Sequence, residues 1–188
     1  DDLATRIVAL EAACGVPVLR MHQVHGADVQ IVEDWSSPVW DPQVDGLVTA
    51  RPGLGLMVRA ADCVPVLLAD VGTGVIGAAH AGRQGMTRGV VPATVAAMRG
   101  RGASRITAWV GPHVCGSCYE VPEQLRAEVV SVVPESWAVT RRGTPALDLG
   151  AGVRSQLVAE GCEVVAVGGC TREDARWHSH RRDGAAAG

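Results

Sequence analysis

Three side chains of types that bind transition metals lie far apart in the sequence, each next to an apolar run. His25 lies in a short segment that contains Gly, Cys63 directly precedes the apolar run 64–69, and His80 directly follows the run 75–79. Two imidazole nitrogens and one thiolate suit zinc, and they leave a fourth coordination position for water or a substrate. Three protein ligands with an open position are typical of a catalytic zinc site.

The two apolar runs predict how two of these side chains meet. The runs 64–69 and 75–79 flank Asp70-Val71-Gly72-Thr73-Gly74, which favours the turn of a β-hairpin. Antiparallel pairing of near-equal arms brings Cys63 and His80 to the open end of that hairpin. Spacing alone does not decide between a metal site and ordinary packing, because a single Cys beside apolar strand residues often only packs in a core, and a single His in a turn is often solvated.

Hydrophobic periodicity and turn residues predict the elements that position these side chains. We expect helices at 3–14, about 86–98, 122–132 and about 149–160, with Pro92 disturbing the first turns of the second helix. Strands are expected at 18–24 and 28–33, joined as a hairpin through His25-Gly26-Ala27, and also at 45–49, 54–59, 64–69, 75–79, 106–110 and 164–167. A loop is expected at 35–43. Because hairpins outnumber strand–helix–strand units, the fold class is α+β with a mixed, largely antiparallel sheet.

The composition is that of one globular domain. The chain has 188 residues, of which 47% are hydrophobic and 20% are charged, with a formal net charge of −3. No run of about 18 apolar residues occurs, so the sequence predicts no membrane-spanning helix. The near-neutral charge balance lacks the basic face that is typical of nucleic-acid binding. Six cysteines in a long, core-rich chain favour a reducing, cytoplasmic setting over a disulfide framework.

A series of motifs along the chain resembles the YfiH-like family, also called the laccase-domain or "polyphenol oxidase" family and, for some bacterial members, peptidoglycan editing factor. The motifs occur in the expected order and span nearly the whole chain: His22-Gln23-Val24-His25-Gly26, Ala61-Asp62-Cys63-Val64-Pro65-Val66-Leu67, His80-Ala81-Gly82, Gly111-Pro112, Cys118-Tyr119-Glu120-Val121, Asp148-Leu149, Cys170-Thr171 and Ser179-His180-Arg181-Arg182-Asp183-Gly184. We therefore expect a single domain over residues 1–188, shortened at both ends relative to the family.

The resemblance implies a fold, a metal and an activity. Family members have a layered α/β/β/α fold and a zinc bound by two His and one Cys, which match His25, Cys63 and His80. The implied activity is phosphorolysis of adenosine, inosine and guanosine, with adenosine deaminase and methylthioadenosine phosphorylase activities in addition. The implied partners are a purine nucleoside and phosphate, and the chain is expected to be a monomer or a weak homodimer.

Other functions stay open at this point. One alternative is a peptidoglycan editing factor that acts on muropeptide precursors, and another is a copper-dependent polyphenol oxidase (laccase). Copper would bind such a site strongly in vitro, as the divalent affinity order predicts. A single His-Cys-His centre lacks the several coppers needed to reduce oxygen to water. A closed, four-ligand metal site would instead indicate a zinc-stabilised binding module.

Residues near the predicted ligands are candidates for catalysis and substrate binding. Alongside Cys63 and His80, Asp62 is expected to be catalytic, as a proton shuttle for deamination, in which zinc lowers the pKa of bound water to about 7. Gly82-Arg83-Gln84-Gly85 before a helix is a candidate phosphate cradle, assisted by Arg88. Expected substrate-binding residues are Gln23, Arg83, Gln84 and Arg182.

At the candidate cradle the sequence departs from the family, whose usual motif is His-Ala-Gly-Trp-Arg-Gly. Arg83-Gln84 stands in place of Trp-Arg, so the positive charge would come from the neighbouring position. The alternative is that Arg83 is only a solvated residue at a helix start.

Two further motifs have more than one interpretation. Cys115-Gly116-Ser117-Cys118 is expected to have a loop role near the metal pocket, with redox chemistry or a metal site shared with His113 as alternatives. Arg181-Arg182-Asp183 is either an internally paired charged turn or a contact to the ribose or phosphate of a substrate.

Overall fold

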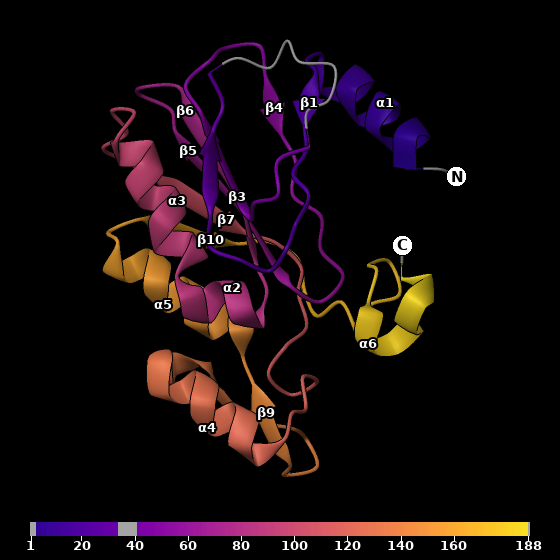
Figure 1. Cartoon of the computed structure of the whole chain (residues 1–188). Helices are drawn as coiled ribbons and strands as arrows, with labels where there is room; N and C mark the ends of the chain where they lie inside the picture. The colour runs from indigo at the N-terminus through magenta and orange to yellow at the C-terminus, as the bar shows by residue number, and fades with distance from the viewer. Residues whose placement is uncertain (1–2, 34–40, 188) are drawn as a thin grey trace.

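A six-stranded mixed sheet forms the centre of the computed structural model, which describes residues 3–33 and 41–187 (Figure 1). Its strands, in spatial order, are β10 (Glu163–Ala166), β7 (Thr107–Val110), β5 (Val64–Asp70), β6 (Val75–Ala81), β3 (Gly46–Thr49) and β2 (Val29–Ile31). The inner pairs β7–β5, β5–β6 and β6–β3 are antiparallel, and the edge pairs β10–β7 and β3–β2 are parallel. The predicted α+β class with a mixed, largely antiparallel sheet is confirmed.

The β5–β6 hairpin forms in the predicted register. Val64 pairs with Ala81, Pro65 with His80, and Asp70 with Val75 at the turn. Alternate residues of β5, Val64, Val66 and Leu68, are buried on one face of the sheet. Since side chains alternate along a strand, Cys63 lies on the opposite face, as does His80.

Helices cover one face of this sheet, and a small second sheet covers the other (Figure 1). The helices α3 (Val90–Arg99) and α5 (Leu149–Ala159) pack on the first face over the larger hydrophobic core. On the other face, β1 (Val18–Leu19) and β4 (Gly55–Leu56) pair in parallel, and α1 (Leu3–Cys14) contacts β1 from outside. A smaller core lies on this face, formed by Met21, Val32, Leu47, Leu54 and Ala78. The layers therefore follow the order α/β/β/α.

The helix expected at 86–98 is two helices. They are α2 (Arg83–Arg88) and α3, separated by Gly89, whose φ of 85° lies in the left-handed region. Pro92 lies in the first turn of α3, where its missing N–H costs no hydrogen bond, whereas within one continuous helix its ring would clash with the preceding turn. The other three predicted helices correspond to α1, α4 (Glu123–Val132) and α5. In the described residues, no helix combines the length and the apolar character needed to cross a membrane.

The predicted hairpin of 18–24 with 28–33 is wrong. β1 pairs instead with β4, and β2 pairs with β3, both in parallel. The intervening turn does not close a two-stranded ladder, because the backbone N–H groups of Val24, His25 and Gly26 donate to the buried carboxylate of Asp45. The loop expected at 35–43 lies mostly outside the described residues.

The sequence did not predict two short elements in the C-terminal half. A hairpin of β8 (Trp137–Val139) and β9 (Pro145–Leu147) follows α4, and a one-turn helix α6 (His180–Asp183) lies near the C-terminus. Ser179 caps α6, because its hydroxyl accepts a hydrogen bond from the Arg182 N–H. Pro145 of β9 and Arg181 of α6 line the same hollow.

Candidate metal centre and its surroundings

The structure brings His25, Cys63 and His80 together, and we call this group the His/Cys centre. One ligand atom from each side chain lies within 4.8 Å of the others. Cys63 Sγ is 3.8 Å from His25 Nε2, and the two imidazole rings are edge to face with centroids 4.8 Å apart. Tetrahedral zinc, with bonds of about 2.3 Å to sulfur and about 2.1 Å to nitrogen, holds such atoms about 3.6 Å apart. The donor set and its spacing therefore fit zinc.

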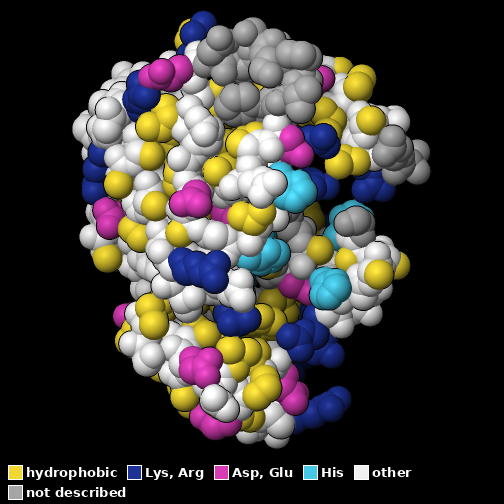
Figure 2. Space-filling view, viewed as in Figure 1, with side chains coloured by type: hydrophobic (Ala, Val, Ile, Leu, Met, Phe, Trp, Pro, Cys, Tyr) yellow, Lys and Arg dark blue, Asp and Glu magenta, His cyan; other side chains and the backbone are white. Residues whose placement is uncertain are grey.

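The centre is closed on one side and open on the other. His80 is buried, Cys63 is partly buried, and His25 is exposed. His25 adopts a positive φ of 59°, which is uncommon for a residue with a side chain. Figure 2 shows His and Arg side chains gathered along a hollow between the main body of the molecule and the lobe on the right, where α6 lies in Figure 1.

Asp45, which was not among the residues predicted for the site, lies on the buried side of the centre and fixes two of its side chains. Its carboxylate is fully buried and accepts a 2.7 Å hydrogen bond from His80 Nδ1. It also accepts hydrogen bonds of 2.6–3.1 Å from the backbone N–H groups of Val24, His25 and Gly26, the turn that carries His25. Asp45 thus leaves Nε2 of His80 free to face the centre and fixes the turn that carries His25. A carboxylate behind a ligating imidazole is a common feature of zinc sites.

The electrostatics of the centre favour a bound cation. Burial, followed by the negative charges of Asp62 and Asp45, raises the pKa of the Cys63 thiol to about 11. Burial also lowers the pKa of His80, in spite of its hydrogen bond to Asp45. His80 is therefore neutral and able to ligate at neutral pH, and a cation would offset the negative charge of a Cys63 thiolate.

Gly82 brings the backbone close to the centre. A Cβ at this position would lie 2.8 Å from His25 Cδ2 and 3.0 Å from Cys63 Sγ. At Gly85, a Cβ would lie 3.0 Å from the carbonyl oxygen of Gly26 and 3.2 Å from that of His80. The glycines around α2 therefore allow this helix to lie directly against the ligand-bearing segments.

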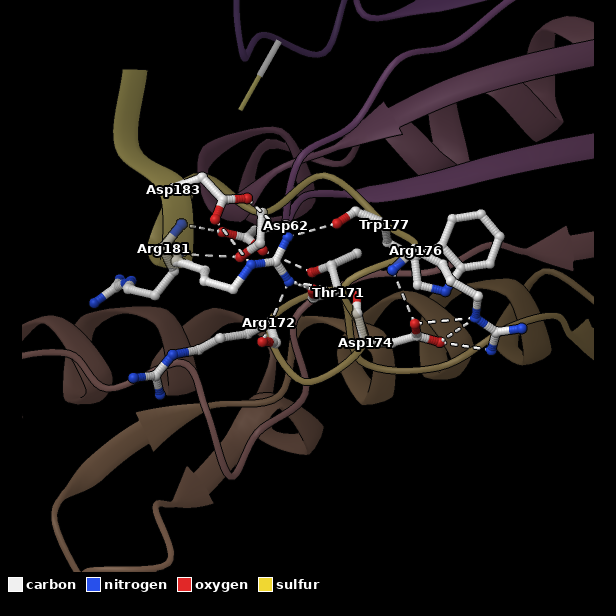
Figure 3. A network of polar contacts seen from close by, with 10 residues as sticks. Asp62, Thr171, Arg172, Asp174, Arg176, Trp177, Arg181 and Asp183 are labelled. Carbon is white, nitrogen blue, oxygen red and sulfur yellow. Dashed lines mark hydrogen bonds and ion pairs between the residues drawn. The ribbon is translucent and has the colours of Figure 1, made fainter. Parts of the chain in front are cut away.

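Asp62, expected to act as a proton shuttle, links the Cys63 loop to the C-terminal segment (Figure 3). Its carboxylate is buried and accepts hydrogen bonds of 2.6 Å each from the Thr171 hydroxyl and the Arg181 N–H. Its φ of 89° is again in the left-handed region. The structure gives Asp62 a positioning contact, and its role in proton transfer stays a prediction.

Two of the expected substrate-binding residues are engaged within the protein. Gln23 donates to the carbonyl of Arg59 at 2.7 Å and accepts its N–H at 2.9 Å. Arg182 donates to the carbonyls of Thr171 and Trp177 and to both carboxylate oxygens of Asp183. This geometry favours the internally paired turn over a substrate contact for Arg182.

The helix α2 carries two cations, Arg83 and Arg88. Arg83 is the first residue of α2 and is half-buried, whereas Gln84 is exposed. Arg88 donates to the carbonyl of His25 at 3.2 Å, so its guanidinium lies beside the turn that carries a ligand. The helix begins at Arg83, three residues before the expected start at Met86.

A second group of metal-binding side chains, which we call the Cys/Glu cluster, contains Cys115, Cys118, Cys170 and Glu173. Cys170 and Glu173 were not predicted as part of this group. His113, which was considered as a ligand together with Cys115 and Cys118, instead donates a hydrogen bond from Nδ1 to the carbonyl of Gly111. Beside the cluster is a hollow of about 510 Å³, whose lining in the described part of the chain includes Cys118, Arg172 and Arg181 but no residue of the His/Cys centre.

Comparison with known proteins identifies the family. Residues 2–188 match the family described as "Multi-copper polyphenol oxidoreductase laccase". The chain is 54% identical over 186 residues to the purine nucleoside phosphorylase ORF3 of Streptomyces griseus, covering 97% of this chain and 74% of that protein. It is 44% identical over 187 residues to a purine nucleoside phosphorylase of Mycobacterium bovis, covering 96% and 74%.

Solved structures agree with the sequence relatives. YlmD from Geobacillus stearothermophilus superposes with a TM-score of 0.82 at 30% identity, over 96% of this chain and 75% of that one. A Neisseria meningitidis protein superposes with a TM-score of 0.81 at 29% identity, over 95% and 74%. The resemblance inferred from the motifs is thereby confirmed. The chain belongs to the multi-copper polyphenol oxidoreductase laccase family, whose members include the YfiH-like proteins.

Proposed function

We propose that the chain is a zinc-dependent purine nucleoside phosphorylase that uses the His/Cys centre. The observation that carries the proposal is the convergence of His25, Cys63 and His80 within 4.8 Å around an open position, with Asp45 orienting His80. Relatives at 44–54% identity bear the name purine nucleoside phosphorylase. We expect adenosine, inosine and guanosine as substrates.

His25, Cys63 and His80 would hold the ion, which when bound supplies an electrophile at the open coordination position. Phosphorolysis breaks the bond between the ribose C1′ and the purine nitrogen while a phosphate oxygen bonds to C1′. The chain must therefore hold an anion against the sugar and exclude water. Arg83 and Arg88 are the cations of α2, and we assign phosphate binding to them, with Arg83 replacing the charge that Gln84 lacks.

Further activities belong to the same proposal. Adenosine deamination would need a carboxylate close to the open position, and Asp62, adjacent to the ligand Cys63, is the candidate. Phosphorolysis of methylthioadenosine would use the same bonds at C1′. Both would share the His/Cys centre with the main reaction, so loss of Cys63 would remove all three activities together.

The test is incubation of metal-analysed protein with adenosine, with and without inorganic phosphate. We expect adenine and ribose 1-phosphate only when phosphate is present, whereas inosine would report deamination. Cys63→Ala should lose both the metal and the turnover, and Cys14→Ala, at an exposed position of α1, should keep both. Equal adenine release by Cys63→Ala and the wild type would refute the proposal, as would turnover only of muropeptides or, with copper, of phenols.

A further inference from the structure

The Cys/Glu cluster joins two segments that are far apart in sequence. The Sγ atoms of its three cysteines and a carboxylate oxygen of Glu173 all lie within 4.8 Å of one another. Cys115 and Cys118 follow β7, and Cys170 and Glu173 follow β10. Because β7 and β10 pair in parallel, the two segments leave the same edge of the sheet side by side. A further bridge between His113 and Cys170 continues this pairing up to the cluster.

The two segments form turns of the same kind. In the first, the N–H groups of Cys118 and Tyr119 donate to the Cys115 carbonyl at 2.9 and 3.0 Å. In the second, the N–H groups of Glu173 and Asp174 donate to the Cys170 carbonyl at 3.2 and 3.0 Å. Each turn therefore presents its first and fourth side chains to the same point, from the spacings Cys-x-x-Cys and Cys-x-x-Glu. Paired turns with this spacing are typical of structural zinc sites.

Hydrogen bonds within the cluster resemble those that support metal-bound thiolates. The Cys115 N–H points at Cys170 Sγ, 3.4 Å away. The Cys118 thiol donates to Glu173 Oε1 at 3.4 Å, so it carries a proton that a metal ion would displace.

A plain ion pair does not account for the whole cluster. Glu173 Oε1 also lies 2.5 Å from Arg141 Nη2, but the Arg141 side chain is 73% exposed and such pairs contribute little to stability. The ion pair does not explain why the sulfur atoms of three cysteines from two segments lie within 4.8 Å of one another. Three sulfur atoms and one carboxylate oxygen suit zinc, and not magnesium or calcium, which prefer oxygen ligands.

We propose that Cys115, Cys118, Cys170 and Glu173 form a second, closed site that binds a structural zinc ion, separate from the His/Cys centre. Both segments of this site also hold Asp62. The Val114 N–H donates to the Asp62 carbonyl at 3.1 Å, and the Thr171 hydroxyl donates to its carboxylate. The ion therefore braces the loop that presents Cys63, and it fixes the C-terminal segment shown in Figure 3.

The experiment measures zinc per chain by elemental analysis of the full chain, purified under reducing conditions. We expect two zinc ions in the wild type and in Cys14→Ala, and one in both Cys63→Ala and Cys118→Ser. The ion retained by Cys63→Ala separates this proposal from that of the His/Cys centre. Cobalt substitution identifies the ligands, because thiolate-to-cobalt charge-transfer absorption should mostly survive in Cys63→Ala and mostly disappear in Cys118→Ser.

Glu173→Gln covers the case in which Cys118→Ser fails to fold, because Glu173 is exposed. This variant should bind its second zinc about tenfold or more weakly. Arg141→Ala, which removes the ion pair and no ligand, should keep the wild-type affinity. Two zinc ions in folded Cys118→Ser, or wild-type zinc affinity in Glu173→Gln, would overturn the proposal. So would a disulfide among the three cysteines in the reduced preparation.

Discussion

At the scale of single residues, the His/Cys centre depends on groups that are not ligands. Asp45 is buried behind His80 and the His25 turn, and Gly82 leaves room beside His25 and Cys63. A ligand set with the right atoms still needs fixed orientations, because metal affinity falls when the supporting hydrogen bonds are lost. Substitution of either Asp45 or Gly82 should therefore weaken metal binding while leaving every ligand in place.

Gly82→Ala should weaken zinc binding at the His/Cys centre by about tenfold or more. Its Cβ would come within 3.0 Å of both His25 and Cys63, so at least one ligand would have to move. Competition with a chromophoric chelator measures the affinity. Gly100→Ala, whose Cβ would meet only ordinary contacts, is the control and should bind zinc as the wild type does.

Asp45→Asn should weaken zinc binding about 10–100-fold. An amide oxygen cannot accept all four of the N–H groups that Asp45 accepts, so the His80 ring and the His25 turn lose fixed positions. The same chelator competition measures the loss. The control Asp41→Asn, at an exposed carboxylate near His22, should bind zinc as tightly as the wild type does. Wild-type zinc affinity in Asp45→Asn would contradict the supporting role of Asp45.

The convergence of the three candidate ligands could be predicted from the sequence, but the groups that support them could not. His25, Cys63 and His80 are of metal-binding types and lie beside clear strand signals. Asp45 shows no local signal, because its partners are backbone N–H groups and an imidazole that only the folded sheet brings near. The backbone partners of Gln23 and Arg182 have no local signal for the same reason, and the substrate-binding roles of these two residues stay predictions.

At the scale of the elements, local pairing was predictable and long-range pairing was not. The β5–β6 hairpin has its turn and both arms within one stretch of sequence. The strands β1 and β2 pair with β4 and β3 across intervening chain, and the sequence holds no local signal for that choice. The short strands β8 and β9 lack the length that a periodic pattern needs.

Gly89→Ala should destabilise the protein by about 1–2 kcal/mol, because a side chain at its φ of 85° is strained. The break between α2 and α3 places α2 against the His/Cys centre, so this strain acts where the two helices join. Urea denaturation measures the free energy of unfolding. Gly100→Ala, at a φ of −59° at the end of α3, should cost much less, and equal losses in both variants would show that the backbone angle is irrelevant.

Asp70 should make the end of the β5–β6 hairpin sensitive to acid. Backbone N–H groups, led by those of Ser104 and Arg105, lower its pKa from the ordinary 3.8 to about 2. Because the folded pKa is the lower one, this stabilisation is complete above pH 4 and disappears as the pH falls towards 2. Between pH 4 and pH 2, the free energy of unfolding should therefore fall less in Asp70→Asn than in the wild type. Urea denaturation midpoints measured across this interval check the difference. In the control Asp28→Asn, the midpoints should fall as they do in the wild type.

At the scale of the whole molecule, each candidate metal site joins segments that are distant in sequence. The His/Cys centre connects the turn before β2 with both ends of the β5–β6 hairpin, and the Cys/Glu cluster connects the ends of β7 and β10. Asp62 links the two, since it precedes Cys63 and accepts hydrogen bonds from the segment that carries Cys170. Metal binding should therefore stabilise the fold as a whole.

Zinc should raise the thermal midpoint of unfolding in proportion to the logarithm of its free concentration. Binding to the folded state alone adds about 2.7 kcal/mol when free zinc is 100 times the dissociation constant. Differential scanning calorimetry with a metal buffer measures the shift. Cys63→Ala should lose the part of the shift that belongs to the His/Cys centre, and a midpoint independent of zinc in the wild type would contradict binding to the folded state.

The contact between Asp62 and Thr171 also has a consequence for biosynthesis. Translation runs from the N-terminus, so His25, Cys63 and His80 all leave the ribosome before Thr171. At about 5–20 residues per second, the delay lasts several seconds. For several seconds, a nascent chain would carry a full set of ligands without the brace that secures the Cys63 loop. An ion captured during that interval would meet a looser pocket than the folded protein offers, and the segment that carries Thr171 would then close behind it.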